Sequence, residues 1–399
     1  MSFLQYIRPF YGKTFFHTIH LRPPEKVCYD ENRQPGRGAA PLTAPAPSAK
    51  KEKRTHMRQI TLGRSGITVP QNGFGALPIQ RISREEAVKL LRRAYEGGIR
   101  YFDTARAYTD SEEKLGEAIK TIPRDQIFIA TKTAAKTPEA FRRDLETSLK
   151  NLGTDYIDVY QFHQMGQCWK EGDGTGMYEC MLKAKEEGKI RHIGATAHKI
   201  GVAFEIAESG LYETLQFPFS YLAGEKEKDL VLLCREKNVG FIAMKGLAGG
   251  LINRYDAAMA FMARYDNVLP IWGVQREREL EEWLSCMDHT PEMTEETAAF
   301  LEKERKELAG DFCRGCGYCM PCTVGIKISN CARTSLLLRR SPSRRWLEPD
   351  WQAEMMKIEN CVECGLCASR CPYELDTPAL LKKNLADYKK ILAGEISVR

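Results

Sequence analysis

Short apolar runs alternate with longer amphipathic runs from Met57 to about residue 290. The short runs are rich in β-branched and aromatic residues, as buried strands are, and the longer runs carry one charged face, as surface helices do. The runs expected to form strands are Asn72–Pro78, Arg100–Asp103, Ile127–Lys132, Ile157–His163, His192–Thr196, Thr214–Pro218, Gly240–Met244 and Val268–Gly273. Helices are expected between them, most clearly at Ser83–Gly97, Thr137–Leu152 and Lys226–Lys237.

Eight strand–helix units over roughly 235 residues predict a (β/α)8 TIM barrel, a fold of about 250 residues. A doubly wound sheet is the alternative, but the glycine-rich first turn of such sheets is missing. Ser83 is expected to cap the N-terminus of its helix, with Glu85 and Glu86 in the first turn. Two earlier runs, Gln59–Gly63 and Ile67–Pro70, predict a hairpin that plugs the floor of the barrel.

Composition and charge bound the class of protein. With 399 residues and 43% hydrophobic content, the chain can hold more than one domain. The net charge of +6 comes from basic residues interspersed with acidic ones, so a nucleic-acid partner is not expected. No apolar run reaches the roughly 18 residues of a membrane helix, and the first residues lack the apolar core of a secretory signal. These features predict a soluble, cytoplasmic protein with no membrane partner.

Cysteine usage changes between the two ends of the chain, because nine of the 14 cysteines lie from Cys313 onward. Spacings of two residues indicate metal binding in a reducing compartment rather than disulfides. One run has three such cysteines followed by a fourth and a proline, the spacing of bacterial ferredoxins, and a near-copy precedes it. The runs are Cys361, Cys364, Cys367, Cys371 and Pro372, and Cys313, Cys316, Cys319 and Cys322.

Two runs predict two [4Fe–4S] clusters. In ferredoxins the fourth cysteine of a run commonly ligates the other cluster. On that scheme one cluster is held by Cys313, Cys316, Cys319 and Cys371, and the other by Cys361, Cys364, Cys367 and Cys322. Because the first run has only two residues before Cys322, Cys331 is a spare or a competing fourth ligand. Structural zinc is the alternative, although zinc sites rarely place three cysteines in one such run.

The cysteines divide the chain into three parts. Residues 1–56 contain a proline- and alanine-rich stretch and a charged run, so we expect disorder there, or an extension upstream of a natural start at Met57. Residues 57–290 are the expected barrel. Residues 291–399 are expected to form a linking helix, Thr294–Leu308, and a small α-helical, ferredoxin-like di-cluster domain that ends in a helix at Thr377–Leu392.

Four polar residues follow neighbouring strands of the predicted barrel. Asp103, Lys132 and His163 stand at the ends of the second, third and fourth strands, and Tyr108 lies in the loop after Asp103. Chemistry in such barrels sits at this end of the strands. An ammonium lowers the pKa of a nearby phenol, and a carboxylate keeps that ammonium charged. Together they predict a proton donor for a carbonyl oxygen.

These blocks resemble the catalytic tetrad of the aldo-keto reductases, and the resemblance spans about Met57 to Cys286. It rests on Phe102-Asp103-Thr104-Ala105-x-x-Tyr108, Ala130-Thr131-Lys132 and Gln161-Phe162-His163. The resemblance implies that Tyr108 is the general acid, that Lys132 and Asp103 tune it, and that His163 orients a small carbonyl substrate. With the cysteine runs included, the chain resembles the ferredoxin-fused branch of that family.

The resemblance also implies residues for NADP(H) or NAD(H). Thr196 and Gln216 match the partners of the nicotinamide carboxamide, and Met244 replaces a tyrosine that stacks on its ring. The adenosine phosphates are implied to lie near Gly273, Gln275 and Arg276, with glycine replacing a lysine and Glu279 replacing an arginine. Arg276 and Arg278 favour NADP(H), because guanidinium groups bind phosphate well. Solvated helix charges are the alternative for both arginines.

The sequence therefore predicts NAD(P)H-dependent carbonyl reduction coupled to electron transfer through two clusters, with a ferredoxin or flavoprotein as a redox partner. A nicotinamide moves two electrons and a cluster moves one, and no flavin motif bridges them. The alternative function is an electron carrier whose barrel is a docking scaffold, or a reductase that works without nicotinamide.

Overall fold

The computed structural model describes residues 57–308, 312–340 and 343–398. The expected disorder or extension at residues 1–56 lies outside the described residues. No helix of the described ranges is long and apolar enough to cross a membrane.

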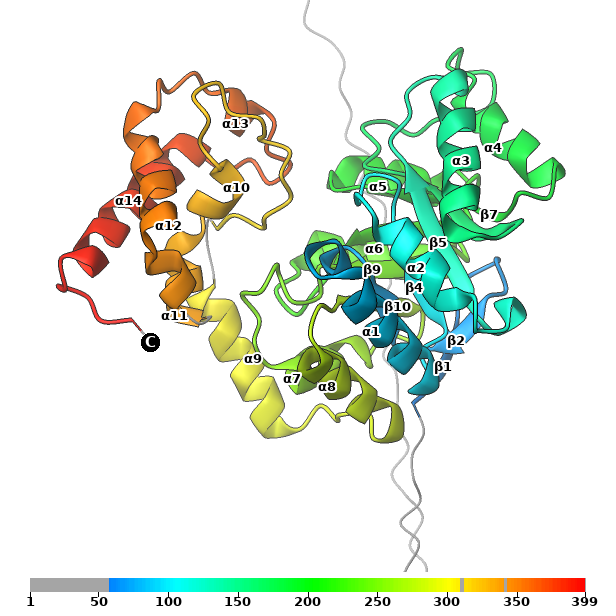
Figure 1. Cartoon of the computed structure of the whole chain (residues 1–399), viewed down its shortest axis with the longest axis horizontal. Coiled ribbons are helices and arrows are strands. Elements are labelled where there is room, and N and C mark those ends of the chain that lie inside the picture. The colour runs from blue at the N-terminus through cyan, green and yellow to red at the C-terminus, as the bar shows by residue number, and fades with distance from the viewer. Residues whose placement is uncertain (1–56, 309–311, 341–342, 399) are drawn as a thin grey trace, which may run out of the picture. The chain divides into compact units, whose positions relative to one another are not determined.

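Eight parallel strands close into a barrel in which the last strand pairs with the first (Figure 1). The strands are β3 (Gly73–Gly75), β4 (Tyr101–Asp103), β5 (Phe128–Thr133), β6 (Ile157–Phe162), β7 (Ile190–Thr196), β8 (Thr214–Pro218), β9 (Gly240–Met244) and β10 (Val268–Gly273). The helices that follow them are α1 (Arg84–Glu96), α2 (Ser111–Ile119), α3 (Pro138–Leu152), α4 (Met177–Glu186), α5 (Ile200–Glu208), α6 (Glu225–Glu236), α7 (Tyr255–Met262) and α8 (Glu277–Asp288). The predicted (β/α)8 barrel is confirmed.

The first strand is shorter than predicted. It was expected to run from Asn72 to Pro78, but β3 ends at Gly75 and Pro78 begins a 3-10 helix, η1 (Pro78–Arg81). Proline has no N–H to donate to a neighbouring strand and is favoured in the first turn of a helix. A second such turn, η2 (Arg124–Gln126), precedes β5.

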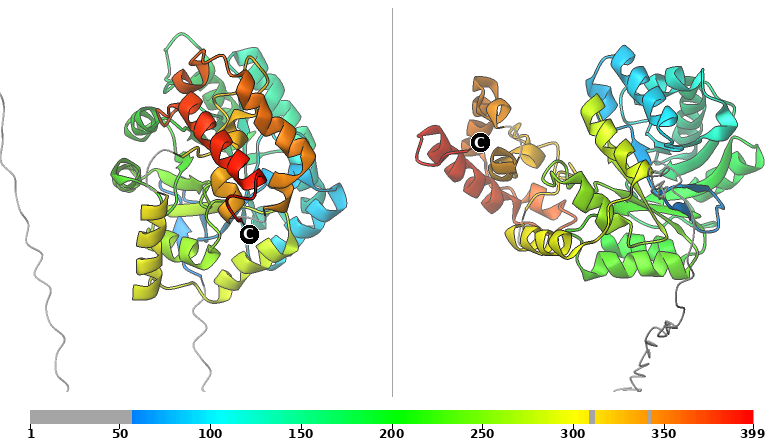
Figure 2. Two further views of the ribbon diagram at one scale, coloured as in Figure 1. Left: turned by 90° about the vertical axis from the view of Figure 1, so that its left-hand side faces the viewer. Right: turned by 90° about the horizontal axis from the view of Figure 1, so that it is seen from below.

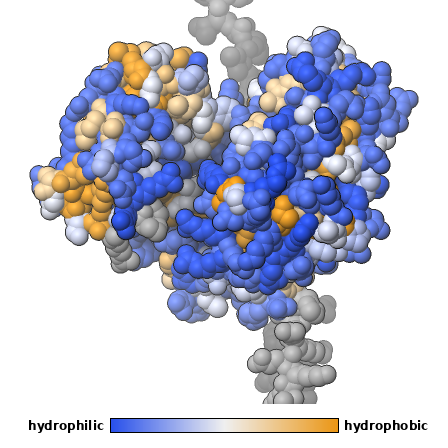
Figure 3. Space-filling model, in the orientation of Figure 1, coloured by the Kyte–Doolittle hydropathy of each residue, from blue (hydrophilic) through white to orange (hydrophobic). Residues whose placement is uncertain are grey.

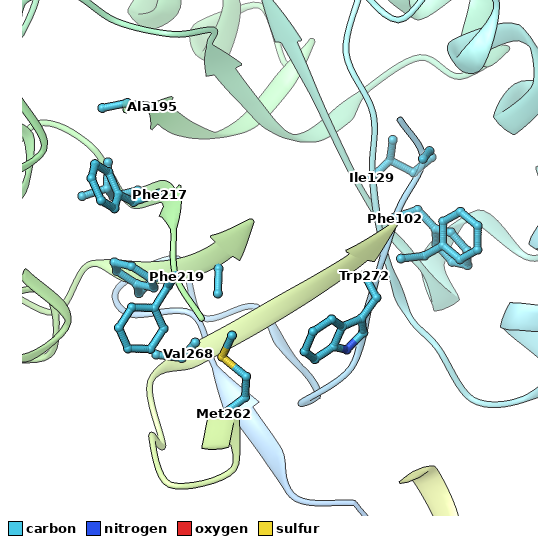
Figure 4. Packing of buried hydrophobic residues seen from close by; sticks show 14 of the residues in the cluster. Phe102, Ile129, Ala195, Phe217, Phe219, Met262, Val268 and Trp272 are labelled. Carbon is cyan, nitrogen blue, oxygen red and sulfur yellow. The ribbon is translucent and has the colours of Figure 1, made fainter. Parts of the chain in front are cut away.

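Alternation along the strands separates two apolar layers. Tyr101 and Ala130 point into the barrel, whereas their neighbours Phe102 and Ile129 pack outward against the helices. Figure 4 shows part of the outer layer, which includes Trp272. The alternation follows from the two-residue period of a strand, which sends successive side chains to opposite faces.

The predicted hairpin is confirmed as β1 (Gln59–Thr61) paired antiparallel with β2 (Thr68–Pro70). Its apolar side chains pack with the inner layer of the barrel. Leu62 approaches Gly240 so closely that a Cβ at that glycine would lie 2.7 Å from the Leu62 Cβ. Because Gly240 is the first residue of β9, the hairpin covers the N-terminal end of the barrel and leaves the other end for the site.

Helix ends agree with their sequence signals. Ser83 and Glu86 form a capping box at the start of α1, in which each side chain accepts a hydrogen bond from the other residue's backbone N–H. The linking helix is α9 (Glu295–Glu307), with Thr294 as its N-cap, and it packs beside α7 (Figure 2). The last helix is α14 (Thr377–Leu392), as predicted.

The C-terminal region is helical and has its own apolar core. Ile328, Leu338, Met355 and Tyr388 are buried there together with several of the cysteines. Its elements before α14 are α10 (Ile328–Cys331), α11 (Thr334–Arg340), η3 (Arg344–Leu347), α12 (Pro349–Met356), η4 (Lys357–Asn360) and α13 (Leu366–Ser369). The sequence did not predict these short helices, because they are too brief to show a clear period.

A buried ion pair connects this region to the barrel. The guanidinium of Arg340 in α11 donates to both carboxylate oxygens of Glu304 in α9, at 2.6 and 2.9 Å. Glu304 also accepts from the hydroxyl of Tyr221, in the loop after β8, and Arg340 donates to the carbonyl of Leu251, in the loop after β9. These contacts fix the C-terminal region against the loops at the end of the barrel that carries the site.

Candidate functional site

The structure brings the four predicted tetrad residues together at the C-terminal ends of neighbouring strands. Asp103 ends β4, Lys132 lies near the end of β5, and His163 directly follows β6. The Lys132 ammonium donates to Asp103 Oδ1 and to the carbonyl of Thr104, both at 2.6 Å. It also lies 5.3 Å from the ring centre of Tyr108.

The Tyr108 and His163 rings meet edge to face, with their centres 5.7 Å apart. Burial raises the pKa of Tyr108, and the charge of Asp103 raises it further. The sequence argument expected Lys132 to lower this pKa. The hydrogen bonds of Lys132 instead go to Asp103 and Thr104, so the phenol stays protonated over the neutral range.

Burial also sets the charge of the other groups. It lowers the pKa of His163 to about 3, with the charges of Lys132, Lys136 and Lys245 acting in the same direction, so this imidazole is neutral at ordinary pH. Burial raises the pKa of Asp103 and lowers that of Lys132, and the attraction between the two opposes both shifts. At 2.6 Å, with further hydrogen bonds to each partner, the two form a buried ion pair.

Two glutamines complete the surroundings of Asp103. Gln161 of β6 donates to Asp103 Oδ2 at 3.1 Å, and the amide of Gln216 from β8 also lies within hydrogen-bonding reach of this carboxylate. Both glutamines keep a buried Oε1 that has no hydrogen-bond partner within the described residues. An orphaned acceptor is costly to bury, so it marks a place for a donor from a ligand. Gln216 is among the residues predicted from the sequence, whereas Gln161 is not.

The residues predicted to hold a nicotinamide lie on three adjacent strand ends. Thr196 ends β7, Gln216 lies in β8 and Met244 ends β9. The Thr196 hydroxyl accepts from the backbone N–H of Gln164 at 2.7 Å. A carboxamide carries an N–H2 group that matches the free Oε1 of Gln216, so these residues fit the nicotinamide end of a dinucleotide.

The residues predicted for the adenosine phosphates have a different arrangement. The Glu279 carboxylate accepts from the backbone N–H groups of Gln275 and Arg276, at 3.0 and 3.1 Å. An acid of the chain thus occupies the N-terminus of α8, the position that attracts phosphate. Arg276 and Arg278 are exposed and lie near acids of their own helix, as solvated helix charges do.

Gly273, where the family resemblance places a lysine, faces η1. A Cβ built on this glycine would lie 3.0 Å from the ring of Pro78. Glycine at this position supplies no cation for a 2′-phosphate, and Pro78 leaves little room there for a longer side chain. The fit to a dinucleotide is good at its nicotinamide end and poor at a 2′-phosphate.

Three residues that the sequence argument did not select also lie at this end of the barrel. His198 follows β7 by two residues, is 4% exposed, and its Nδ1 lies 2.9 Å from the hydroxyl of Tyr318. Tyr318 belongs to the first cysteine run. Lys245 directly follows β9, and its charge acts on both His163 and His198. Lys245 and His198 could have been found from the sequence, because both lie within two residues of the end of a predicted strand.

The cysteines of the two runs line two separate pockets. One pocket is lined by Cys313, Cys316, Cys319 and Cys371, and the other by Cys319, Cys322, Cys361, Cys364 and Cys367. This distribution matches the crossed pairing of the two runs, with Cys319 shared between the walls. All of these cysteines are free thiols. No three His, Cys, Asp or Glu side chains in the described ranges are grouped to hold a single metal ion.

Cys331 lines neither pocket. It is fully buried in the apolar core of the region, where burial raises the pKa of its thiol to about 12.

The second pocket lies near the surface, since Cys364 is exposed and its neighbour Val362 is 66% exposed. On the face drawn in Figure 3, hydrophobic patches gather over the C-terminal region.

Comparisons with known proteins agree with this geometry. Residues 71–260 match the Aldo/keto reductase family, and residues 312–376 match the 4Fe-4S dicluster domain. An L-galactose dehydrogenase from Arabidopsis thaliana is 30% identical over 50% of this chain and 68% of its own length. An NADH-specific methylglyoxal reductase from Escherichia coli is 28% identical over 49% of this chain and 69% of its own length.

The barrel is also similar to solved structures. A thermostable aldo-keto reductase in complex with the inhibitor epalrestat is 25% identical, with a TM-score of 0.54 over 62% of this chain and all of its own length. The chain matches 61–69% of the length of its curated relatives, among them an aldo-keto reductase of Glycine max. The C-terminal cysteine region lies outside the family match to the barrel.

Proposed function

The chain belongs to the aldo/keto reductase family and carries a 4Fe–4S dicluster domain, and we propose that it reduces a small carbonyl substrate with a nicotinamide as hydride donor. The observation that carries this proposal is the convergence of Asp103, Tyr108, Lys132 and His163 at one end of the barrel. Such an arrangement has no evident structural purpose, because burying an ion pair costs free energy.

In this proposal Tyr108 is the general acid. Its buried phenol holds a proton over the neutral range, and the Lys132 ammonium near its ring stabilises the negative charge left when that proton moves. Asp103 fixes the ammonium in place. The neutral imidazole of His163 can donate to the carbonyl oxygen and so orient the substrate against Tyr108.

A nicotinamide would be held by Thr196, Gln216 and Met244. Gln216 offers its free Oε1 to the carboxamide, and Met244 offers a polarizable side chain to the ring. When bound, the nicotinamide supplies the hydride to the carbonyl carbon. Glu279 would repel a 2′-phosphate at α8, so we propose that NADH is used at least as well as NADPH. The relative named as an NADH-specific methylglyoxal reductase supports this choice.

We also propose that the two cysteine-lined pockets hold one [4Fe–4S] cluster each. The crossed cysteine sets that line them support this count. Cys319 lines both pockets, so electrons could pass between the clusters there, and the clusters would exchange single electrons with a ferredoxin or flavoprotein at the exposed side near Cys364.

Kinetics of the protein purified without oxygen test the proposed reaction. Oxidation of NADH and of NADPH is followed with a panel of carbonyl compounds that includes methylglyoxal. Tyr108→Phe should lower kcat/KM by at least about 100-fold, because a general acid contributes that much or more. Tyr95→Phe is the matched control and should change little, because Tyr95 is a half-buried residue of α1 that is not part of the tetrad.

Two results would overturn the proposal. If Tyr108→Phe keeps full activity, then the phenol is not the acid. If the wild-type chain binds neither nucleotide while a one-electron donor bleaches its cluster absorbance, then the chain is an electron carrier, or a reductase that works without nicotinamide.

A further inference from the structure

We propose that His198 is a second substrate-contacting histidine beside His163, that Tyr318 of the first cysteine run positions it, and that the substrate is a carbonyl compound with an adjacent acidic group, a 2-oxo acid. The dicluster domain would then supply part of the reductase site. This inference rests on the proposed carbonyl reduction, and it adds a contact residue, a positioning residue and a substrate class.

The position of His198 in the barrel brings it close to His163. His198 follows the end of β7, the strand next to β6, which leads directly into His163. The two imidazoles therefore lie on adjacent strand ends, close enough that charging one would disfavour charging the other. His198 is 4% exposed, so its ring is shielded from solvent.

The hydrogen bond to Tyr318 decides which nitrogen carries the proton. The Tyr318 hydroxyl lies 2.9 Å from His198 Nδ1, with the rings edge to face and their centres 5.1 Å apart. A phenol is a stronger hydrogen-bond donor than a neutral imidazole N–H, so we assign the Tyr318 hydroxyl as the donor and an unprotonated Nδ1 as the acceptor. Burial lowers the pKa of His198 well below its ordinary value and keeps the ring neutral. The hydrogen of the neutral ring then lies on Nε2.

That Nε2–H group has no partner. It is buried and makes no hydrogen bond to any part of the chain that the structure describes. Leaving such a donor unpaired costs about 1–3 kcal/mol, so its presence indicates a ligand acceptor at this position. Since His163 is already expected to bind the carbonyl oxygen, the acceptor at His198 is a second oxygen of the substrate.

Charge identifies that second oxygen as anionic. Lys245 acts electrostatically on both histidines, and its half-buried ammonium has no hydrogen bond or ion pair with another described residue. Lys136 adds a further positive charge near His163. Lys132, by contrast, is already neutralised by Asp103. A carboxylate next to the carbonyl would satisfy His198 and lie in this positive potential.

Tyr318 is held in place by contacts around its loop. Arg333 of the C-terminal region donates to the carbonyl of Gly249, in the loop after β9, at 3.1 Å. Gly249 and Gly315 have φ angles of +68° and +67°, and a Cβ at either position would meet the Arg333 guanidinium. Glycine at both positions lets the arginine lie between the barrel loop and the cysteine loop, which fixes Tyr318 over His198.

Three substitutions test the proposal, each in protein with intact clusters verified by iron and sulfide content. Tyr318→Phe removes the hydroxyl and keeps the ring. His198→Phe removes the Nε2–H donor, whereas His198→Gln keeps an N–H donor. Tyr373→Phe is the matched control, because Tyr373 lines the pocket formed by the first cysteine run and its hydroxyl makes no hydrogen bond to another described residue.

Reduction of pyruvate, methylglyoxal and propanal is compared in each variant. Tyr318→Phe and His198→Phe should lower kcat/KM for pyruvate and methylglyoxal by about ten-fold, the value of one good hydrogen bond, mostly through a higher KM. Both should lower kcat/KM for propanal less than for pyruvate, because propanal has no second oxygen to lose a hydrogen bond. Compared with His198→Phe, His198→Gln should recover part of the lost kcat/KM for pyruvate. Lys245→Met should lower kcat/KM for pyruvate more than for methylglyoxal.

Calorimetric binding of oxamate, an unreactive analogue of pyruvate, gives a readout that does not depend on turnover. We expect Tyr318→Phe and His198→Phe to weaken oxamate binding about ten-fold and Tyr373→Phe to leave it unchanged. Unchanged oxamate binding and unchanged pyruvate kinetics in both variants would overturn the inference. If the wild-type chain reduces no carbonyl but binds oxamate through His198, the proposed reaction fails and this site stands.

Discussion

The substitution Glu279→Gln should lower the KM for NADPH relative to the KM for NADH. The Glu279 carboxylate caps α8 by accepting from two backbone N–H groups, and its side chain is only 28% exposed. Glutamine keeps an acceptor oxygen for these N–H groups, so Glu279→Gln removes the charge and retains the cap. The change isolates the electrostatic effect of one carboxylate on a nearby phosphate.

The size of the effect follows from Coulomb's law. Two like charges about 4 Å apart repel by about 4 kcal/mol at an effective dielectric constant of about 20. Partial exposure and salt reduce this to about 1–2 kcal/mol for a phosphate at the end of α8. The ratio of KM for NADPH to KM for NADH should therefore fall by roughly 5- to 30-fold in Glu279→Gln.

Steady-state kinetics with both nucleotides at low ionic strength measure this ratio. Glu282→Gln is the matched control, because Glu282 lies on the same helix and pairs with the exposed Arg278 at 3.9 Å. A shift in Glu279→Gln that the control does not show, and that shrinks with added salt, supports the reasoning. An unchanged ratio in a folded Glu279→Gln protein refutes the placement of the nucleotide phosphates at α8.

Three further predictions concern the clusters, the acid sensitivity and the contact between the domains. Cys331→Ser should keep roughly eight iron atoms per chain, whereas Cys322→Ser should lose about half of them, as metal analysis would show. Burial lowers the pKa of His163 from 6.5 to about 3, so unfolding takes up a proton below pH 6.5 and the protein loses stability as the pH decreases. His163→Asn should therefore reduce the fall in melting temperature between about pH 7 and pH 5. Arg340→Met should lower the free energy of unfolding by about 3–5 kcal/mol, because it leaves the carboxylate of Glu304 buried without its partner, and an unchanged melting temperature would contradict this.

Much of the fold could be predicted because it depends on local patterns. The strands of the barrel are short apolar runs, and the cap at Ser83 has its acid three residues later in the first turn. The tetrad could be predicted for a related reason. Once strands are placed in a parallel barrel, residues at their C-terminal ends must share one rim, so Asp103, Lys132 and His163 had to be neighbours.

Other parts of the site depend on contacts that no local pattern encodes. Tyr318 and His198 are 120 residues apart, and their hydrogen bond requires the cysteine loop to be seated on the barrel. The capping role of Glu279 could have been predicted from the sequence, since an acid at the third position of a helix is one half of a capping box. The family resemblance relates position 279 only to an arginine, which says nothing about how an acid there affects the helix terminus.

The position of the cysteine runs in the fold matters more for function than their spacing. A run with ferredoxin spacing identifies a cluster, but it does not say which group of the protein lies beside it. Here a tyrosine between two cysteines of the first run bonds to a histidine at the rim of the barrel. Any change that disorders this loop, including loss of a cluster, would also release His198 from its partner. Reduction of 2-oxo acids would then depend on intact clusters even where the hydride comes from nicotinamide alone, because the cysteine loop supplies a part of the site.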